Sequence, residues 1–238
     1  MAGHSQFKNI MYRKGAQDAK RAKLFTKLLR EIYVAAKDGA DVNYNSRLRT
    51  AMATARQANI PKDRIETAVE KASNPADSNN FEEMRYEGYA PGGIAVIVEA
   101  LTDSRNRAAS DIRSLFTKSG GQLGETGSVS FLFKHLGLIY YPKTAGSEDD
   151  FIETLIEAGG SDCIPQDEYF ELSCEPDDFA RVRDALEAKF GSAESAQLTW
   201  RPLNSTVLSA EDTQKVERLI DALEDLDDVQ NVICNAEL

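Results

Sequence analysis

Hydrophobic residues in the first third of the chain recur at the three- and four-residue spacing of amphipathic helices. This spacing predicts one helix around Phe25–Ala36, a second around Leu48–Ala55 and a third over residues 62–72. Pro61 stands near the first turn of the third helix, where its missing backbone N–H is tolerated. Eight residues of turn and loop chemistry, Ser73–Asn80, then interrupt the helical pattern. We therefore expect residues 1–76 to form a small helical domain.

Beyond residue 80 the pattern changes to short apolar runs rich in β-branched residues. Ile94–Leu101 predicts a buried strand, followed by a helix that begins at Thr102–Asp103 and ends near Lys118. A second strand is expected over residues 128–133, which makes a β-α-β unit. Around these elements, residues 86–93 and 134–137 are interpreted as loops, the latter a hairpin loop that contains His135.

The remaining chain holds two further groups of alternating strands and helices. Residues 138–200 predict the order β-α-β-β-α-β, with helices over 148–158 and 176–190, which is typical of the split ferredoxin-like fold. Residues 206–234 predict a strand, a helix and a strand, which make only half of an α/β domain. Joined to the similar half formed by residues 81–133, they complete one domain, with residues 136–203 inserted between the halves. The fold class is thus α+β multidomain: an N-terminal helical domain followed by two α/β domains, the last one ferredoxin-like and inserted in the middle one. The expected domains are residues 1–76, residues 77–135 with 204–238, and residues 136–203.

Composition excludes several classes of protein. The chain has 238 residues, 42% of them hydrophobic, so it can bury a core. No run approaches the roughly 18 apolar residues that cross a bilayer, and no secretory signal core is present near the start. We expect a soluble cytoplasmic protein without a membrane partner. Three cysteines without a C-x-x-C motif predict buried structural thiols at Cys174 and Cys234, with neither a zinc site nor a disulfide framework.

Catalytic chemistry has no signature in the sequence. Neither of the two histidines, His4 and His135, belongs to a recognisable catalytic constellation. We therefore expect no enzyme activity, no cofactor, no metal and no small-molecule substrate.

The net charge of -11 taken alone argues against a nucleic-acid binder, but the charge is unevenly distributed. Residues 1–73 carry a net charge of +8, whereas the rest of the chain carries -19. Within residues 1–30, eight basic residues stand against one acid. Four of them follow the 3-4-3 spacing that lines one face of a helix: Lys20, Lys23, Lys27 and Arg30. This face lies opposite Phe25, Leu28 and Ile32. We expect these eight side chains to contact nucleic-acid phosphates: Lys8, Arg13, Lys14, Lys20, Arg21, Lys23, Lys27 and Arg30.

Two aromatic residues, Phe7 and Tyr12, lie among these cations, where they would stack on unpaired bases. The cationic face has an alternative interpretation that does not involve nucleic acid. In this interpretation the face is ordinary solvated surface, or it packs against the acidic remainder of its own chain. A protein-interaction scaffold that grips an acidic partner is a further alternative.

Several blocks of residues resemble the YebC/PmpR family. They include the opening Met1–Ile10, the block Asn59–Glu66, the block Tyr86–Gly93 and the glycine-rich block Gly120–Val129. The resemblance spans residues 1–133 in order, and Gln6-Phe7 replaces the family's usual Lys-Trp pair. It implies a three-domain cytoplasmic protein that acts as a DNA-binding transcriptional regulator. It also implies a rival function, because relatives in mitochondria are translational activators and bacterial members have been connected with ribosomes and stalled translation.

The block Thr102–Arg107 lies at a predicted strand-to-helix turn. Backbone N–H groups at such a turn, together with Arg105 and Arg107, would hold a phosphate as a secondary contact. The alternative is helix capping and local ion pairing. Nucleic acid, either DNA or ribosomal RNA, is therefore the expected partner, and backbone contacts alone do not distinguish the two.

Overall fold

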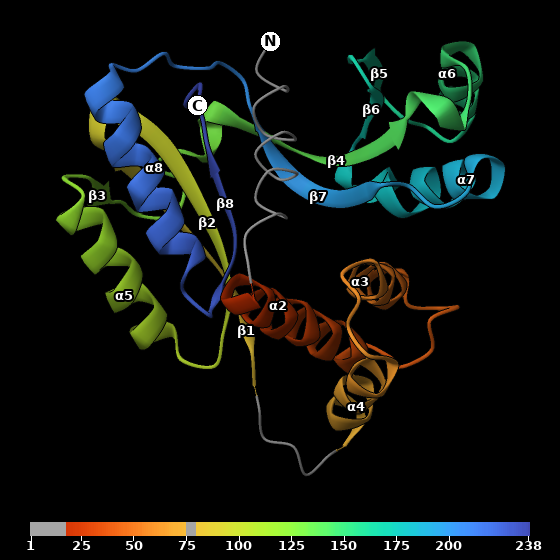
Figure 1. Ribbon diagram of the computed structural model, residues 1–238, viewed down its shortest axis with the longest axis horizontal. Coiled ribbons are helices and arrows are strands. Elements are labelled where there is room, and N and C mark those ends of the chain that lie inside the picture. The colour runs from red at the N-terminus through yellow and green to blue at the C-terminus, as the bar shows by residue number, and fades with distance from the viewer. Residues whose placement is uncertain (1–17, 75–79) are drawn as a thin grey trace. The chain divides into compact units, whose positions relative to one another are not determined.

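The structure is a computed structural model that describes residues 18–74 and 80–238. Contacts divide the chain into two compact units, Met1–Leu132 with Pro202–Leu238, and Phe133–Arg201 (Figure 1). The helical region shares the first unit with a sheet. The domain boundary expected near residue 76 therefore stays a prediction.

The helical region consists of α2 (Asp18–Lys37), α3 (Ser46–Gln57) and α4 (Lys62–Ser73), which confirms the three helices expected from the spacing. Their common core is made by Ile32, Leu48 and Ile65, all of them fully buried or nearly so. Asn45 caps α3, because its side-chain oxygen accepts a hydrogen bond from the backbone N–H of Leu48 at 2.9 Å.

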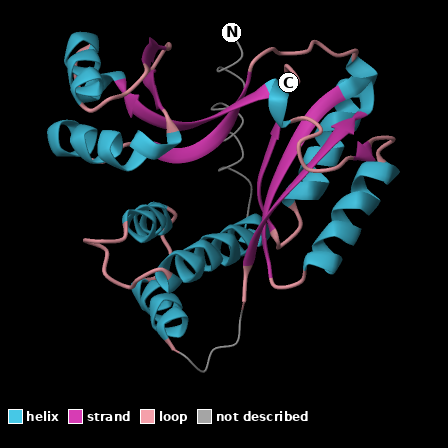
Figure 2. Cartoon of the chain, turned by 180° about the vertical axis from the view of Figure 1, so that it is seen from behind, coloured by secondary structure: helices cyan, strands magenta, loops and turns pink. Residues whose placement is uncertain are grey.

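The sheet of the first unit has the strand order β3-β1-β2-β8. Its strands are β1 (Glu82–Ala90), β2 (Ile94–Thr102), β3 (Gln122–Leu123) and β8 (Val229–Cys234). Val96 and Val98 of β2 pack in one cluster with residues of α5 (Arg105–Lys118) and α8 (Ala210–Glu224). Both helices therefore cover the same face of the sheet, as Figure 2 shows. Because β8 pairs with β2, chain segments more than 100 residues apart complete one sheet.

The second unit has the ferredoxin-like order β-α-β-β-α-β. Its elements are β4 (Phe133–Pro142), α6 (Glu148–Glu157), β5 (Asp162–Pro165), β6 (Tyr169–Cys174), α7 (Phe179–Phe190) and β7 (Ser195–Pro202). The strand order is β5-β6-β4-β7, and α6 and α7 share one core cluster with the inward residues of β4 and β6. The α+β fold class predicted from the sequence is confirmed.

Two predictions about the first sheet were wrong. Residues 86–90 are not a loop but part of β1, which pairs with β2 along its whole length. Gly88 was interpreted as a loop residue, but it permits close packing. A Cβ atom at Gly88 would lie 2.6 Å from the carbonyl oxygen of Gln122 on the neighbouring strand β3. The expected strand at Thr206–Leu208 is reduced to a single bridge between Thr206 and Ala236.

The expected strand over residues 128–133 and hairpin loop over 134–137 were also wrong. Ser130–Leu132 forms a 3-10 helix, and β4 then runs without a break from Phe133 through His135 and Gly137. Gly137 faces α7, because a Cβ atom there would lie 2.5 Å from the ring of Phe179. The glycine therefore marks tight packing of a helix on the sheet and not a turn.

Candidate nucleic-acid interface

The predicted phosphate-binding residues fall into two groups. Lys8, Arg13 and Lys14 lie outside the described residues, and Lys20 and Arg21 belong to α2 but their side chains are not described. The remaining three, Lys23, Lys27 and Arg30, lie on α2 and are described in full. We call Lys20, Lys23, Lys27 and Arg30 the α2 stripe.

The described part of the α2 stripe lies against the C-terminal end of α8. Lys23 Nζ is 3.0 Å from a carboxylate oxygen of Asp225, and Lys27 Nζ donates to the backbone carbonyl of Glu224 at 2.7 Å. That carbonyl is at the last residue of α8, where the helix dipole is negative. Burial lowers the pKa of Lys27 and outweighs the nearby acids Glu224 and Asp225, which act to raise it.

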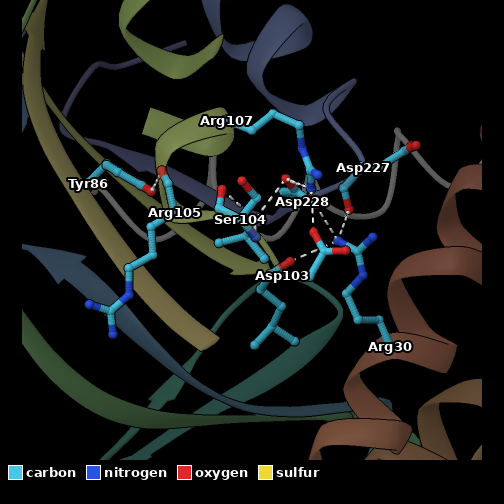
Figure 3. A network of polar contacts seen from close by, with 10 residues as sticks. Arg30, Tyr86, Asp103, Ser104, Arg105, Arg107, Asp227 and Asp228 are labelled. Atoms are coloured by element: carbon cyan, nitrogen blue, oxygen red, sulfur yellow. Dashed lines mark hydrogen bonds and ion pairs between the residues drawn. The ribbon is translucent and has the colours of Figure 1, made fainter. Parts of the chain in front are cut away.

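Arg30 is held in a buried polar network (Figure 3). Its Nη1 lies 2.8 Å from the carbonyl oxygen of Leu101, 2.8 Å from that of Asp227 and 2.9 Å from a carboxylate oxygen of Asp228. The guanidinium also stands 4.7 Å from the ring centre of Phe81. The side chains of Arg30 and Asp228 are only 14% and 11% exposed. This cation is therefore a structural link between α2 and the sheet of the same unit.

The Asp228 carboxylate accepts hydrogen bonds from three side chains in that network. Besides Arg30, its second carboxylate oxygen accepts from Arg107 Nη2 at 2.8 Å and from the hydroxyl of Thr102 at 3.0 Å. A carboxylate with two guanidinium partners and a hydroxyl is well compensated for its burial. The elements α2, β2 and α5 therefore meet at one charged side chain, which directly precedes β8.

Arg105 and Arg107 are both engaged with acids of the same unit. Arg105 forms an ion pair with Glu82, and Arg107 pairs with Asp103 at 2.7 Å and with Asp228. The hydrogen bond from Arg107 lowers the pKa of Asp103. This geometry matches the local ion pairing that the sequence left as the alternative, and the phosphate contact at these two residues stays a prediction.

Sequence reasoning missed a surface on α3 and the loop before it. Tyr44 is 92% exposed, although its loop is held firmly. The side-chain amide of Asn45 donates to the carbonyls of Ala35 and Gly39, both at 2.7 Å, and Asp41 accepts from the backbone N–H of Asn43 at 2.9 Å. A rigid loop therefore presents an aromatic ring to solvent. The signal was available as Asn43-Tyr44-Asn45 directly before α3, which begins at Ser46.

The charges of α3 and α4 differ. Helix α3 contains three arginines and no acid. Arg47 pairs with Glu31 and Glu83, and Arg56 is exposed with no acidic partner among the residues that the structure describes. The exposed positions of α4 include Asp63, Glu66 and Glu70. Of these two helices, α3 is the one whose surface suits a phosphate backbone.

Other kinds of site find no support within residues 18–74 and 80–238. No group of His, Cys, Asp and Glu side chains there is placed to hold a metal ion, and no helix of that part is long and apolar enough to cross a membrane. None of Cys163, Cys174 and Cys234 takes part in a disulfide within this part of the chain. Burial raises the pKa of Cys163 and of Cys174 to about 11.

The fold and this interface define a multidomain α+β protein whose helical region carries an excess of positive charge. Comparison with known proteins then identifies the family. The TACO1/YebC N-terminal domain matches residues 5–75, and the TACO1/YebC second and third domain matches residues 81–236. The chain belongs to the TACO1/YebC family.

Relatives of similar length support this assignment. Two proteins of Rickettsia bellii, from strains OSU 85-389 and RML369-C, are each named "probable transcriptional regulatory protein" and are 53% identical over 240 residues. The match covers 100% of this chain and 94% or 95% of the relatives. A crystal structure of a conserved hypothetical protein from Aquifex aeolicus superposes with a TM-score of 0.82 at 45% identity, over 92% of this chain and 91% of that one. The names of the two Rickettsia bellii relatives describe probable transcriptional regulators.

Proposed function

We propose that this protein is a non-enzymatic, cytoplasmic, nucleic-acid-binding regulator of gene expression that acts as a DNA-binding transcriptional regulator. The observation that carries the proposal is the eight-to-one excess of basic residues in residues 1–30, joined to a helical region with an acid-free α3. Each cation that neutralises a phosphate releases condensed counterions, so such a surface binds nucleic acid without reading its sequence.

The rest of the chain restricts where nucleic acid binds. Residues 74–238 carry a net charge of -19, which repels a phosphate backbone. The helical region is therefore the part of the protein that contacts nucleic acid, and the two sheets supply surfaces for other partners. The names of the relatives in Rickettsia bellii agree with a role in transcription.

A second candidate function is translational: a factor that binds ribosomal RNA and relieves stalled translation. The exposed ring of Tyr44 favours this candidate, because aromatic side chains stack on unpaired bases, which RNA loops offer and duplex DNA does not. The same basic residues would neutralise the RNA backbone.

One experiment separates these functions. The purified protein is tested in a single salt buffer for co-sedimentation with ribosomes and, in parallel, for binding to promoter DNA. A regulator of transcription binds the DNA and stays in the supernatant, whereas a translation factor sediments with ribosomes. A protein that binds neither partner at low salt refutes both functions.

A further inference from the structure

The turn at the end of α8 is a short acidic segment that contacts the helical region. Four of the five residues from Glu224 to Asp228 are acids. We call Glu224–Asp228 the acidic turn. Its residues bind the three described cations of the α2 stripe one after another. Lys23 pairs with the carboxylate of Asp225, and Lys27 donates to the backbone carbonyl of Glu224. Arg30 donates to the backbone carbonyl of Asp227 and pairs with the carboxylate of Asp228.

The acidic turn thus presents to α2 what a nucleic-acid backbone would present. It offers closely spaced acceptors, the carboxylates of Asp225 and Asp228 and the backbone carbonyls of Glu224 and Asp227, at the negative end of the α8 dipole. A lysine whose ammonium is held by this turn is not available to neutralise a phosphate. The two ligands therefore compete for the same side chains.

The exposure of the contact between the α2 stripe and the acidic turn increases from Arg30 to Lys23. At Arg30 it is buried, whereas the Lys23–Asp225 pair is 41% and 63% exposed. A cavity of about 430 Å³ lies beside the contact and is lined by cations and acids alike, among them Lys23, Arg30, Asp111 and Asp225. Water therefore reaches the Lys23 end. Exposed ion pairs with this access are weak and sensitive to salt, so this end is the one that can open.

We propose that the acidic turn is an internal competitor of nucleic acid for the α2 stripe, which holds Lys23 and Lys27 until a phosphate backbone displaces it. The buried pair of Arg30 and Asp228 stays intact, so α2 remains attached to the acidic turn while the two lysine contacts open. This inference rests on the nucleic-acid-binding function proposed above. Its consequence is that the measured affinity for nucleic acid is lower than the intrinsic affinity of the stripe, by the fraction of molecules in which the lysines are free.

The test is a comparison of three full-length proteins with one fluorescent DNA duplex and one single-stranded RNA at low salt. The proteins are the unmodified chain, the variant Asp225→Asn/Asp227→Asn, and the control Glu125→Gln/Glu217→Gln. The control also removes two negative charges, but at exposed positions whose side chains have no partner among the described residues. It therefore measures the general effect of net charge.

We expect Asp225→Asn/Asp227→Asn to bind roughly three- to tenfold more tightly than the unmodified protein, and the control less than about twofold more tightly. The difference between the two variants shrinks as salt is raised, because the released contact is screened. Equal affinities of the two variants, with the unmodified protein binding, overturn the internal competitor. If none of the three proteins binds either probe, the proposed function itself fails.

A second measurement tests the contact without nucleic acid. Acylation of lysines at limiting reagent, read by mass spectrometry, reports how accessible each ammonium group is. We expect faster modification of Lys23, whose ammonium pairs with the Asp225 carboxylate, in Asp225→Asn/Asp227→Asn than in the control. An unchanged rate at Lys23 contradicts the proposal, because the acidic turn would then not restrain the exposed end of the stripe.

Discussion

Replacing Asp228 by asparagine removes a carboxylate that joins α2, β2 and α5. The side chain is 11% exposed and accepts hydrogen bonds from Arg30, Arg107 and Thr102. In the variant Asp228→Asn, the Arg30 guanidinium remains 14% exposed and faces a neutral amide. Arg107 is affected less, because it is half exposed and keeps its pair with Asp103.

The expected loss of stability follows from this burial. Removing one partner of a buried ion pair leaves an uncompensated charge and costs about 3–5 kcal/mol. That is a large share of the roughly 5–15 kcal/mol that stabilises a folded domain. For a unit of this size each kcal/mol corresponds to about 2–4 °C, so the midpoint of thermal unfolding should fall by roughly 6–20 °C. Circular dichroism during heating, with urea unfolding for the free energy, measures both quantities.

Two controls separate the buried pair from a general effect of charge. Asp225→Asn removes an acid that is 63% exposed, so its effect on stability should stay below about 1 kcal/mol. In a double-mutant cycle, Arg30→Met/Asp228→Asn should cost less than the sum of the two single changes, because the double variant leaves no unpaired Arg30. If Asp228→Asn and Asp225→Asn unfold at the same temperature, the reasoning about the buried network is refuted.

Two further predictions concern other residues of the first unit. Tyr44→Ala should weaken binding to single-stranded RNA by about 1–3 kcal/mol if the ring stacks on a base, while Tyr44→Phe and duplex DNA binding remain unchanged in the same fluorescence titration. Glu87 is 1% exposed and accepts from the backbone N–H groups of Val129 and Ser130 at 2.9 and 2.8 Å. Burial acts to raise the pKa of Glu87, but the backbone hydrogen bonds outweigh it, so the pKa is lowered from the ordinary 4.5. This stabilisation is therefore present above about pH 4.5 and is lost as the pH falls through the lowered pKa. Urea unfolding should show Glu87→Gln less stable than the unmodified protein by about 1.5–3 kcal/mol at pH 7, and a gap that persists undiminished in acid would contradict this assignment.

The sequence predicted elements wherever a single periodicity dominates. The helices of the first 73 residues and the ferredoxin-like order follow from apolar spacing. Strand β1 was missed because Gly88 and Pro91-Gly92-Gly93 are typical of loops, whereas Gly88 makes room for β3. Local patterns do not show which glycine serves a turn and which serves close packing, since that depends on a neighbouring strand from elsewhere in the chain.

The candidate site shows the same limit more clearly. The spacing of Lys23, Lys27 and Arg30 predicts a cationic face on a helix, and the structure has that helix. Its ligand within the chain lies about 200 residues away, between Glu224 and Asp228, and only the fold brings the two together. The distinction between a free cationic stripe and one held by acids is therefore a tertiary property.

The salt dependence of DNA binding tests the central claim most directly. The claim is that the α2 stripe contacts phosphates, and each lost phosphate contact lowers the slope of log K against log [salt] by about 0.9 for duplex DNA. The variant Lys20→Gln/Lys23→Gln/Lys27→Gln spares Arg30, whose loss would disturb the fold. The account predicts weaker binding and a slope smaller in magnitude by about 2 to 3 than that of the unmodified protein. An unchanged affinity with an unchanged slope would contradict it.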